Sequence, residues 1–146
     1  MKTILAFLQS PSEKIFPEGT SPRIINMYKD DQEYHRKMLR QSMTGNRLYQ
    51  SFGGTFNDII WDNVAPIDEV DMRHVEMSIV KHKPYLILTF GTQAEEALDG
   101  AIGAMNIKRM CCHHPNARGR TQSDLDYFAT KVIEFMRNWN HESKIH

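Results

Sequence analysis

Two adjacent histidines and a proline, His113, His114 and Pro115, directly follow an apolar run of the sequence. An imidazole N–H that a rigid proline turn aims in one direction is a good donor to negative charge that develops as a bond breaks. We therefore expect His114 to be a catalytic electrostatic donor, whereas His113 is expected to be structural or to face a phosphate. The alternative for His114 is a histidine that only caps a turn.

A second polar pair, Asp62 and Asn63, ends another apolar run. The Asn63 amide carries both a donor and an acceptor, so it could read the edge of a bound heterocycle, but it could equally be a turn residue ahead of Pro66. Asp62 is the carboxylate nearest to the expected pocket, and it is a candidate for activating a water molecule. A carboxylate in this position more often caps a turn or pairs with a surface arginine.

Small polar residues and a glycine complete the candidate site. The hydroxyl and N–H groups of Ser10 and Ser12 could hold a water molecule or a phosphate, although a Ser-Pro-Ser segment is more often only a loop. Gly91 follows the clearest strand and would allow a ligand or another backbone segment to come close. Cys111 and Cys112 stand beside the two histidines, but four consecutive residues cannot all face one ion, so we expect no metal site.

The charge of the chain is balanced, with 18 Lys and Arg against 18 Asp and Glu, so any contact with nucleic acid must come from a local patch. Arg118 and Arg120 lie beside the His-His-Pro segment and are expected to contact phosphates. The basic stretch 35–47 is expected to be a solvated helix face. Two adjacent cysteines and no second pair indicate a reducing, cytoplasmic compartment. No apolar run approaches 18 residues, so we expect no membrane association.

The apolar spacing predicts alternating strands and helices. The predicted strands are 1–8, 56–64, 85–90 and 107–112, and the predicted helices are 30–49 with an interruption at 44–45, 69–82, one capped by Thr92, and one capped by Ser123, with a turn at 51–54. This alternation predicts one domain over residues 1–146, a three-layer α/β/α sandwich with a four-stranded, mainly parallel sheet. Ligands of such folds bind beyond the carboxyl ends of the strands, where the polar residues described above would converge.

Four segments, in order, resemble motifs of the uracil-DNA glycosylase superfamily. They are ILAFLQSPS (4–12), IIWDNVAPI (59–67), LILTFGTQAEEAL (86–98) and MCCHHPNARGR (110–120). The resemblance implies a DNA-repair hydrolase that cleaves an N-glycosidic bond to a uracil-like or modified base without a cofactor.

The resemblance also implies roles for individual residues. His114 matches the histidine that donates to the base carbonyl, and Asn63 matches the asparagine that reads the base edge. Ser10 stands where the family has the Asp or Asn that positions the attacking water. Phe52 or Phe56 matches the aromatic residue on which the base stacks.

Departures from the family pattern keep other functions open. Leu8 stands for the usual glycine of the first motif, Asn116 for a serine of the histidine loop, and Ala117 for its second proline. One alternative is therefore a homologue that binds a nucleotide, base or DNA without cleavage. Another is a protein-interaction module.

Overall fold

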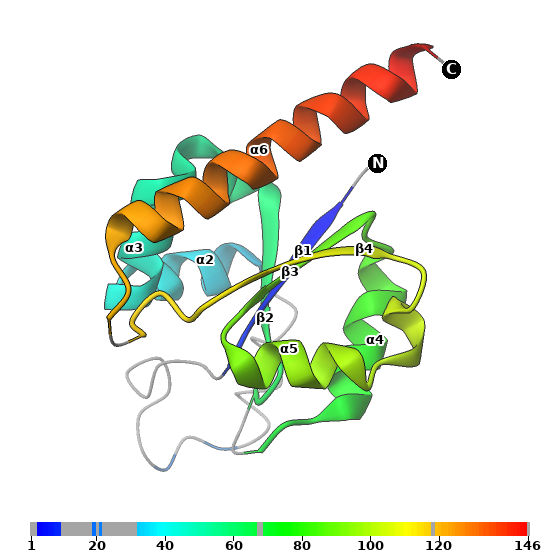
Figure 1. Ribbon diagram of the computed structural model, residues 1–146. Coiled ribbons are helices and arrows are strands. Elements are labelled where there is room, and N and C mark those ends of the chain that lie inside the picture. The colour runs from blue at the N-terminus through cyan, green and yellow to red at the C-terminus, as the bar shows by residue number, and fades with distance from the viewer. Residues whose placement is uncertain are drawn as a thin grey trace.

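A four-stranded, all-parallel sheet forms the centre of the molecule (Figure 1). The computed structural model describes residues 3–9, 19, 21, 32–66, 69–117 and 119–145. The strands are β1 (Ile4–Leu8), β2 (Ile59–Asn63), β3 (Leu86–Phe90) and β4 (Lys108–Cys112), in the spatial order β2-β1-β3-β4. The described helices are α2 (Gln32–Arg40), α3 (Met43–Phe52), α4 (Met72–His82), α5 (Thr92–Asp99) and α6 (Gln122–Ile145), with short 3₁₀ turns η1 (Gly53–Asp58) and η2 (Ile102–Ala104).

Helices cover both faces of the sheet, which confirms the predicted α/β/α sandwich. Helices α2, α3 and α6 lie on one face, and α4 and α5 on the other (Figure 1). Because side chains alternate along a strand, β1 directs Ile4, Ala6 and Leu8 to the first face and Leu5 and Phe7 to the second. Both central strands are buried on both faces, so an uninterrupted apolar run is what such strands require.

The strand order creates a switch point between β1 and β3. The chain passes from β1 to β2 through α2 and α3 on one face, and from β2 through α4 to β3 on the other. At the carboxyl end of the sheet, Leu8 pairs with Asn63, and Phe90 pairs with Cys112. Open α/β sheets bind ligands in this place, because the loops that leave the two central strands diverge there.

The beginning of β2 lies later than the sequence indicated. Phe56 does not start the strand but belongs to η1, and its ring lies in the core 5.0 Å from that of Trp61. The indole N–H of Trp61 donates to the carbonyl oxygen of Phe56 at 3.0 Å. Phe56 therefore fills the core from a 3₁₀ turn and not from the strand. Its apolar character alone could not distinguish these two conformations.

The interruption predicted at Thr44-Gly45 also lies elsewhere, between α2 and α3 at Gln41 and Ser42. The Ser42 hydroxyl caps α3 by accepting from the N–H of Gly45 at 3.0 Å. Gly45 lies inside α3, at a point where an added Cβ would overlap the carbonyl group of Leu39 at the end of α2. The predicted turn at 51–54 was wrong in its first half, since α3 continues to Phe52.

The predicted caps of the last two helices were wrong. Gly91, and not Thr92, precedes α5, and no side chain caps that helix. Helix α6 begins one residue before Ser123, because Thr121 and Asp124 exchange hydrogen bonds. The Thr121 N–H donates to Oδ2 of Asp124 at 3.0 Å, and the Asp124 N–H donates to Oγ1 of Thr121 at 3.3 Å. This is the reciprocal arrangement of a capping box.

Candidate functional site

The loop that carries His114 folds over the carboxyl end of β3. A Cβ atom added to Gly91 would lie 3.5 Å from Cβ of His114. Gly91 has φ 101° and ψ 159°, a backbone conformation that is essentially restricted to glycine. The predicted close approach at Gly91 is therefore made by the histidine loop, which brings His114 to the switch point of the sheet.

The hydrogen bonds of His114 fix which ring nitrogen carries the proton. The backbone N–H of Asn116 donates to Nδ1 of His114 at 3.1 Å. Burial lowers the pKa of His114 below its ordinary 6.5, and a positive charge on the neighbouring His113 would lower it further. The ring is therefore neutral near pH 7. Since Nδ1 accepts, Nε2 carries the proton and is the donor nitrogen.

Helix α3 holds the histidine loop in place. Nη1 of Arg47 donates to the carbonyl oxygen of Pro115 at 2.8 Å, and Nδ2 of Asn116 donates to Oγ1 of Thr44 at 2.7 Å. The amide of Gln122 donates to the carbonyl oxygen of Arg47 at 2.9 Å, which joins α6 to the same helix. Arg47 therefore differs from the solvated helix face expected for 35–47. The Asn116 side chain is engaged by Thr44, and its backbone N–H orients His114.

Asn63 ends β2 with an unpaired acceptor. Its relative exposure is only 6%, and its Oδ1 has no hydrogen-bond partner among the described residues. A buried carbonyl oxygen without a donor costs about 1–3 kcal/mol, so a ligand N–H would relieve that cost. Asn63 and the end of β3 are separated by β1, which is two strand spacings or about 10 Å.

Asp62 lies on the opposite face of the sheet from Asn63. Its carboxylate is 2.8 Å from Nε2 of His74, accepts from the Ser78 hydroxyl at 2.7 Å, and accepts the backbone N–H of Asn63 at 2.8 Å. His74 and Ser78 both belong to α4. The structure thus directs Asp62 away from the Asn63 side chain and to a helix, where it fixes α4 against β2. Its partner is a helix histidine and not a surface arginine.

Replacing Asp62 with alanine is expected to lower the free energy of unfolding by at least about 2 kcal/mol, because His74 and Ser78 would each lose a buried partner and each group left unsatisfied costs about 1–3 kcal/mol. Urea unfolding followed by circular dichroism measures the change. Asp71→Ala is the matched control. It removes only an exposed cap of α4, the acceptor for the His74 N–H, and should cost about 1 kcal/mol. Equal losses in the two variants would contradict the bracing role of Asp62.

Phe52 and Phe56, the expected base-stacking residues, both lie in the core. Their relative exposures are 3% and 0%. The Phe52 ring meets Trp61 and Phe90 edge to face, at 6.2 and 6.3 Å between ring centroids. The aromatic residues of α3 and η1 therefore support the sheet from below the candidate site.

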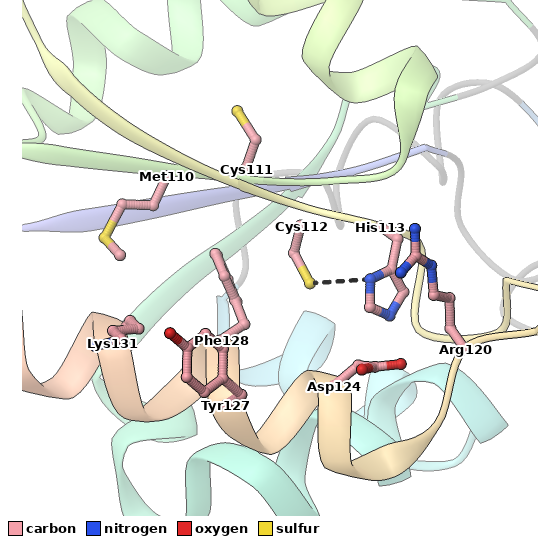
Figure 2. A pocket seen from close by; sticks show the side chains of 9 residues that line it. All are labelled: Met110, Cys111, Cys112, His113, Arg120, Asp124, Tyr127, Phe128 and Lys131. Carbon is pink, nitrogen blue, oxygen red and sulfur yellow. Dashed lines mark hydrogen bonds between the residues drawn. The ribbon is translucent and has the colours of Figure 1, made fainter.

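Of the remaining predicted site residues, the structure describes only His113 and Arg120. Ser10, Ser12 and Arg118 lie outside the described residues. His113 and Arg120 line a cavity of about 480 Å³ between β4 and α6 (Figure 2). That cavity also contains the exposed Tyr127 of α6, which sequence reasoning missed. The sequence offered one indication of its position: Tyr127 directly precedes Phe128, which faces the core, so the Tyr127 ring has to point outward.

The molecule as described is a doubly wound α/β protein with its candidate site at the carboxyl edge of the sheet. No family model matches the chain, and no significant match exists among curated proteins or solved structures. Within the described ranges, no three His, Cys, Asp or Glu side chains gather closely enough to hold a metal ion. None of the helices described there has the length and apolarity needed to cross a membrane.

Proposed function

We propose that this protein hydrolyses an N-glycosidic bond to a uracil-like or modified base in DNA, as the resemblance to the uracil-DNA glycosylase superfamily implies. The observation that carries the proposal is the hydrogen bonding of His114. Its Nδ1 accepts from Asn116, so a neutral ring presents Nε2–H beside the end of β3. A donor whose direction is fixed before the reaction can stabilise negative charge without the cost of reorganisation.

The proposed reaction divides the work between two strand ends. A water oxygen forms a bond to the sugar carbon, and the electron pair of the broken C–N bond stays on the departing base. His114 Nε2–H donates to the base oxygen on which that charge accumulates. The unpaired Oδ1 of Asn63 accepts an N–H of the base and selects its edge. The proton that the water loses passes to solvent or to the released base.

Base release from labelled oligonucleotides tests the proposal. Single- and double-stranded substrates that contain uracil, hypoxanthine or an oxidised base are incubated with the protein, and abasic sites are detected by alkaline strand cleavage. We expect release from at least one of these substrates. If folded protein releases none of these bases, the hydrolase assignment fails for them.

The environment of Asp62 supports a second candidate, which is binding without cleavage. Asp62 is committed to α4, and Ser10 stands where the family has its water-positioning Asp or Asn. A protein without a residue that positions water would hold the base between His114 and Asn63 and leave the bond intact. Tight binding of a base-containing oligonucleotide with no release over hours would favour this candidate.

The rate of base release should depend on pH through His114. The pKa of His114 lies below 6.5, so at pH 6.5 the rate should still exceed half of its value at pH 8, and it should fall further under more acidic conditions. Protonation of Nδ1 removes the acceptor for the Asn116 N–H, and the ring loses its orientation. A rate that already halves at pH 6.5 or above would contradict the lowered pKa.

The same shift affects stability with a defined sign. The unfolded chain binds the His114 proton at an ordinary pKa near 6.5, whereas the folded chain binds it only at lower pH. Stability is therefore complete above pH 6.5 and decreases as the pH falls through the folded pKa. His114→Gln has no ionisable group at this position. The wild type should therefore lose free energy of unfolding relative to this variant on acidification.

A further inference from the structure

A cavity adjoins the candidate site where α6 crosses β4, the strand at one side of the sheet (Figure 2). Its volume of about 480 Å³ falls in the range of sites that hold small organic ligands. Met110, Cys112 and Phe128 form its apolar part and are themselves packed against the core. The cavity therefore offers an apolar wall of a size that suits a planar ring.

An unsatisfied ring nitrogen lies in the wall of this cavity. Nε2 of His113 is buried and has no hydrogen-bond partner in the part of the chain that the structure describes. Its Nδ1 lies 3.7 Å from Sγ of Cys112 (Figure 2). Burial raises the pKa of Cys112 to about 11, so the thiol is protonated and can donate to Nδ1. The His113 proton then resides on Nε2, which can donate a hydrogen bond to an acceptor such as a carbonyl oxygen.

The rim of the cavity combines an aromatic face with charges. Tyr127 is 67% exposed, and Nζ of Lys131 lies 5.3 Å from its ring centroid. Arg120 and Asp124 stand at the opposite end beside His113 (Figure 2). Exposed tyrosine rings are good stacking partners for nucleobases, since every base has a flat π face. Asp124 supplies an acceptor and Arg120 a cation.

A second cavity, of about 600 Å³, shares Arg120 with the first. It lies between α3 and the residues that lead into α6. Two guanidinium groups, Arg47 and Arg120, line it together with amide side chains, and no carboxylate belongs to its lining. One nitrogen of Arg47 is used by Pro115, which leaves further N–H donors of the same fork. Such a set of donors matches a phosphate group.

We propose that the two cavities together bind one nucleotide of a single-stranded nucleic acid, with its base on Tyr127 and its phosphate between Arg120 and Arg47. The base edge would meet Nε2 of His113 and the carboxylate of Asp124. Since the lining residues flank the histidine loop, the bound nucleotide is a neighbour of the one whose base meets His114. The choice of a nucleic-acid strand, and not a free nucleotide, as the ligand rests on the proposed function. A free mononucleotide would offer the same chemistry.

Fluorescence anisotropy with a fluorescein-labelled 12-residue thymidine oligomer tests the inference. This oligomer contains no uracil or damaged base, so binding is measured apart from cleavage. Tyr127→Ala should raise Kd about tenfold or more. Tyr127→Phe should keep the Kd of the wild type, because stacking requires the ring and not the hydroxyl. Met77→Ala, a similarly exposed apolar residue on α4, is the control for surface truncation and should leave Kd unchanged.

The phosphate part of the inference is tested by salt dependence. Arg120→Gln should weaken binding and reduce the slope of log K against log salt by about 0.7, the value for one contact to a single strand. Arg137→Gln removes the same charge from an exposed position further along α6 and should not change the slope.

The outcomes separate the sources and the two proposals. Displacement of the oligomer by thymidine monophosphate at equal concentration would support the nucleotide site and assign it to the free nucleotide. An unchanged Kd in Tyr127→Ala would overturn the inference, even if base release is observed. Tyr127-dependent binding without base release would leave the inference standing and overturn only the hydrolase assignment.

Discussion

His114→Ala is expected to slow base release at least about a hundredfold with little effect on the fold. The variant loses a preorganised donor, and one such donor contributes about 3–4 kcal/mol to transition-state stabilisation in other enzymes. The ring is half-buried and its Nδ1 only accepts the Asn116 N–H, so the structural cost is small. Single-turnover kinetics at saturating protein measure the chemical step apart from binding.

A matched histidine in the same loop sharpens this test. His113→Ala removes a side chain that faces the cavity between β4 and α6, so base release from saturating protein should change less than about fivefold. His114→Gln retains an amide donor and should fall between wild type and His114→Ala. Base release at the wild-type rate in His114→Ala would eliminate the donor role of this residue.

Gly45→Ala is expected to lower the free energy of unfolding by at least about 3 kcal/mol, beyond the usual cost of overpacking. An added Cβ would overlap the carbonyl group of Leu39, which is main chain of α2 and cannot rotate away. The two helices would have to separate. Since α3 carries Thr44 and Arg47, their displacement would also loosen the loop that holds His114.

Gly54→Ala is the matched control for this change. Gly54 is exposed, has a negative φ, and has no atom within 4 Å of the position of an added Cβ. Its substitution should change stability by no more than about 0.5 kcal/mol. Urea unfolding of both variants provides the comparison, and similar stabilities would show that α2 and α3 do not approach each other as described.

The sheet was predictable because each of its central strands is a nearly uninterrupted apolar run in the sequence. Residues 4–8 and 86–90 are apolar on both faces, a pattern that requires cover on two sides. Helical spacing between these runs then predicts parallel crossovers. The positions of Asn63 and His114 at one edge follow from strand polarity, since all strands point the same way.

The predictions failed where a conformation depended on a partner distant in sequence. The break in the helix near Gly45 depends on how closely α2 and α3 pack, and the start of β2 depends on the place of Phe56 beneath Trp61. Asp62 looked like part of the site because it adjoins Asn63. Neighbouring strand residues face opposite sides, and only the packing of α4 decided which side belonged to Asp62.

The sequence by itself determined the class of the fold, the order of its elements, and the edge at which His114 and Asn63 stand. These properties follow from periodicity and strand direction, which are local. Only the tertiary structure decided that Nε2 is the donor of His114, since that depends on the turn to Asn116 and on burial. It also decided that Arg47 anchors a loop 68 residues away, because helix packing brings distant groups together without any pattern in the chain.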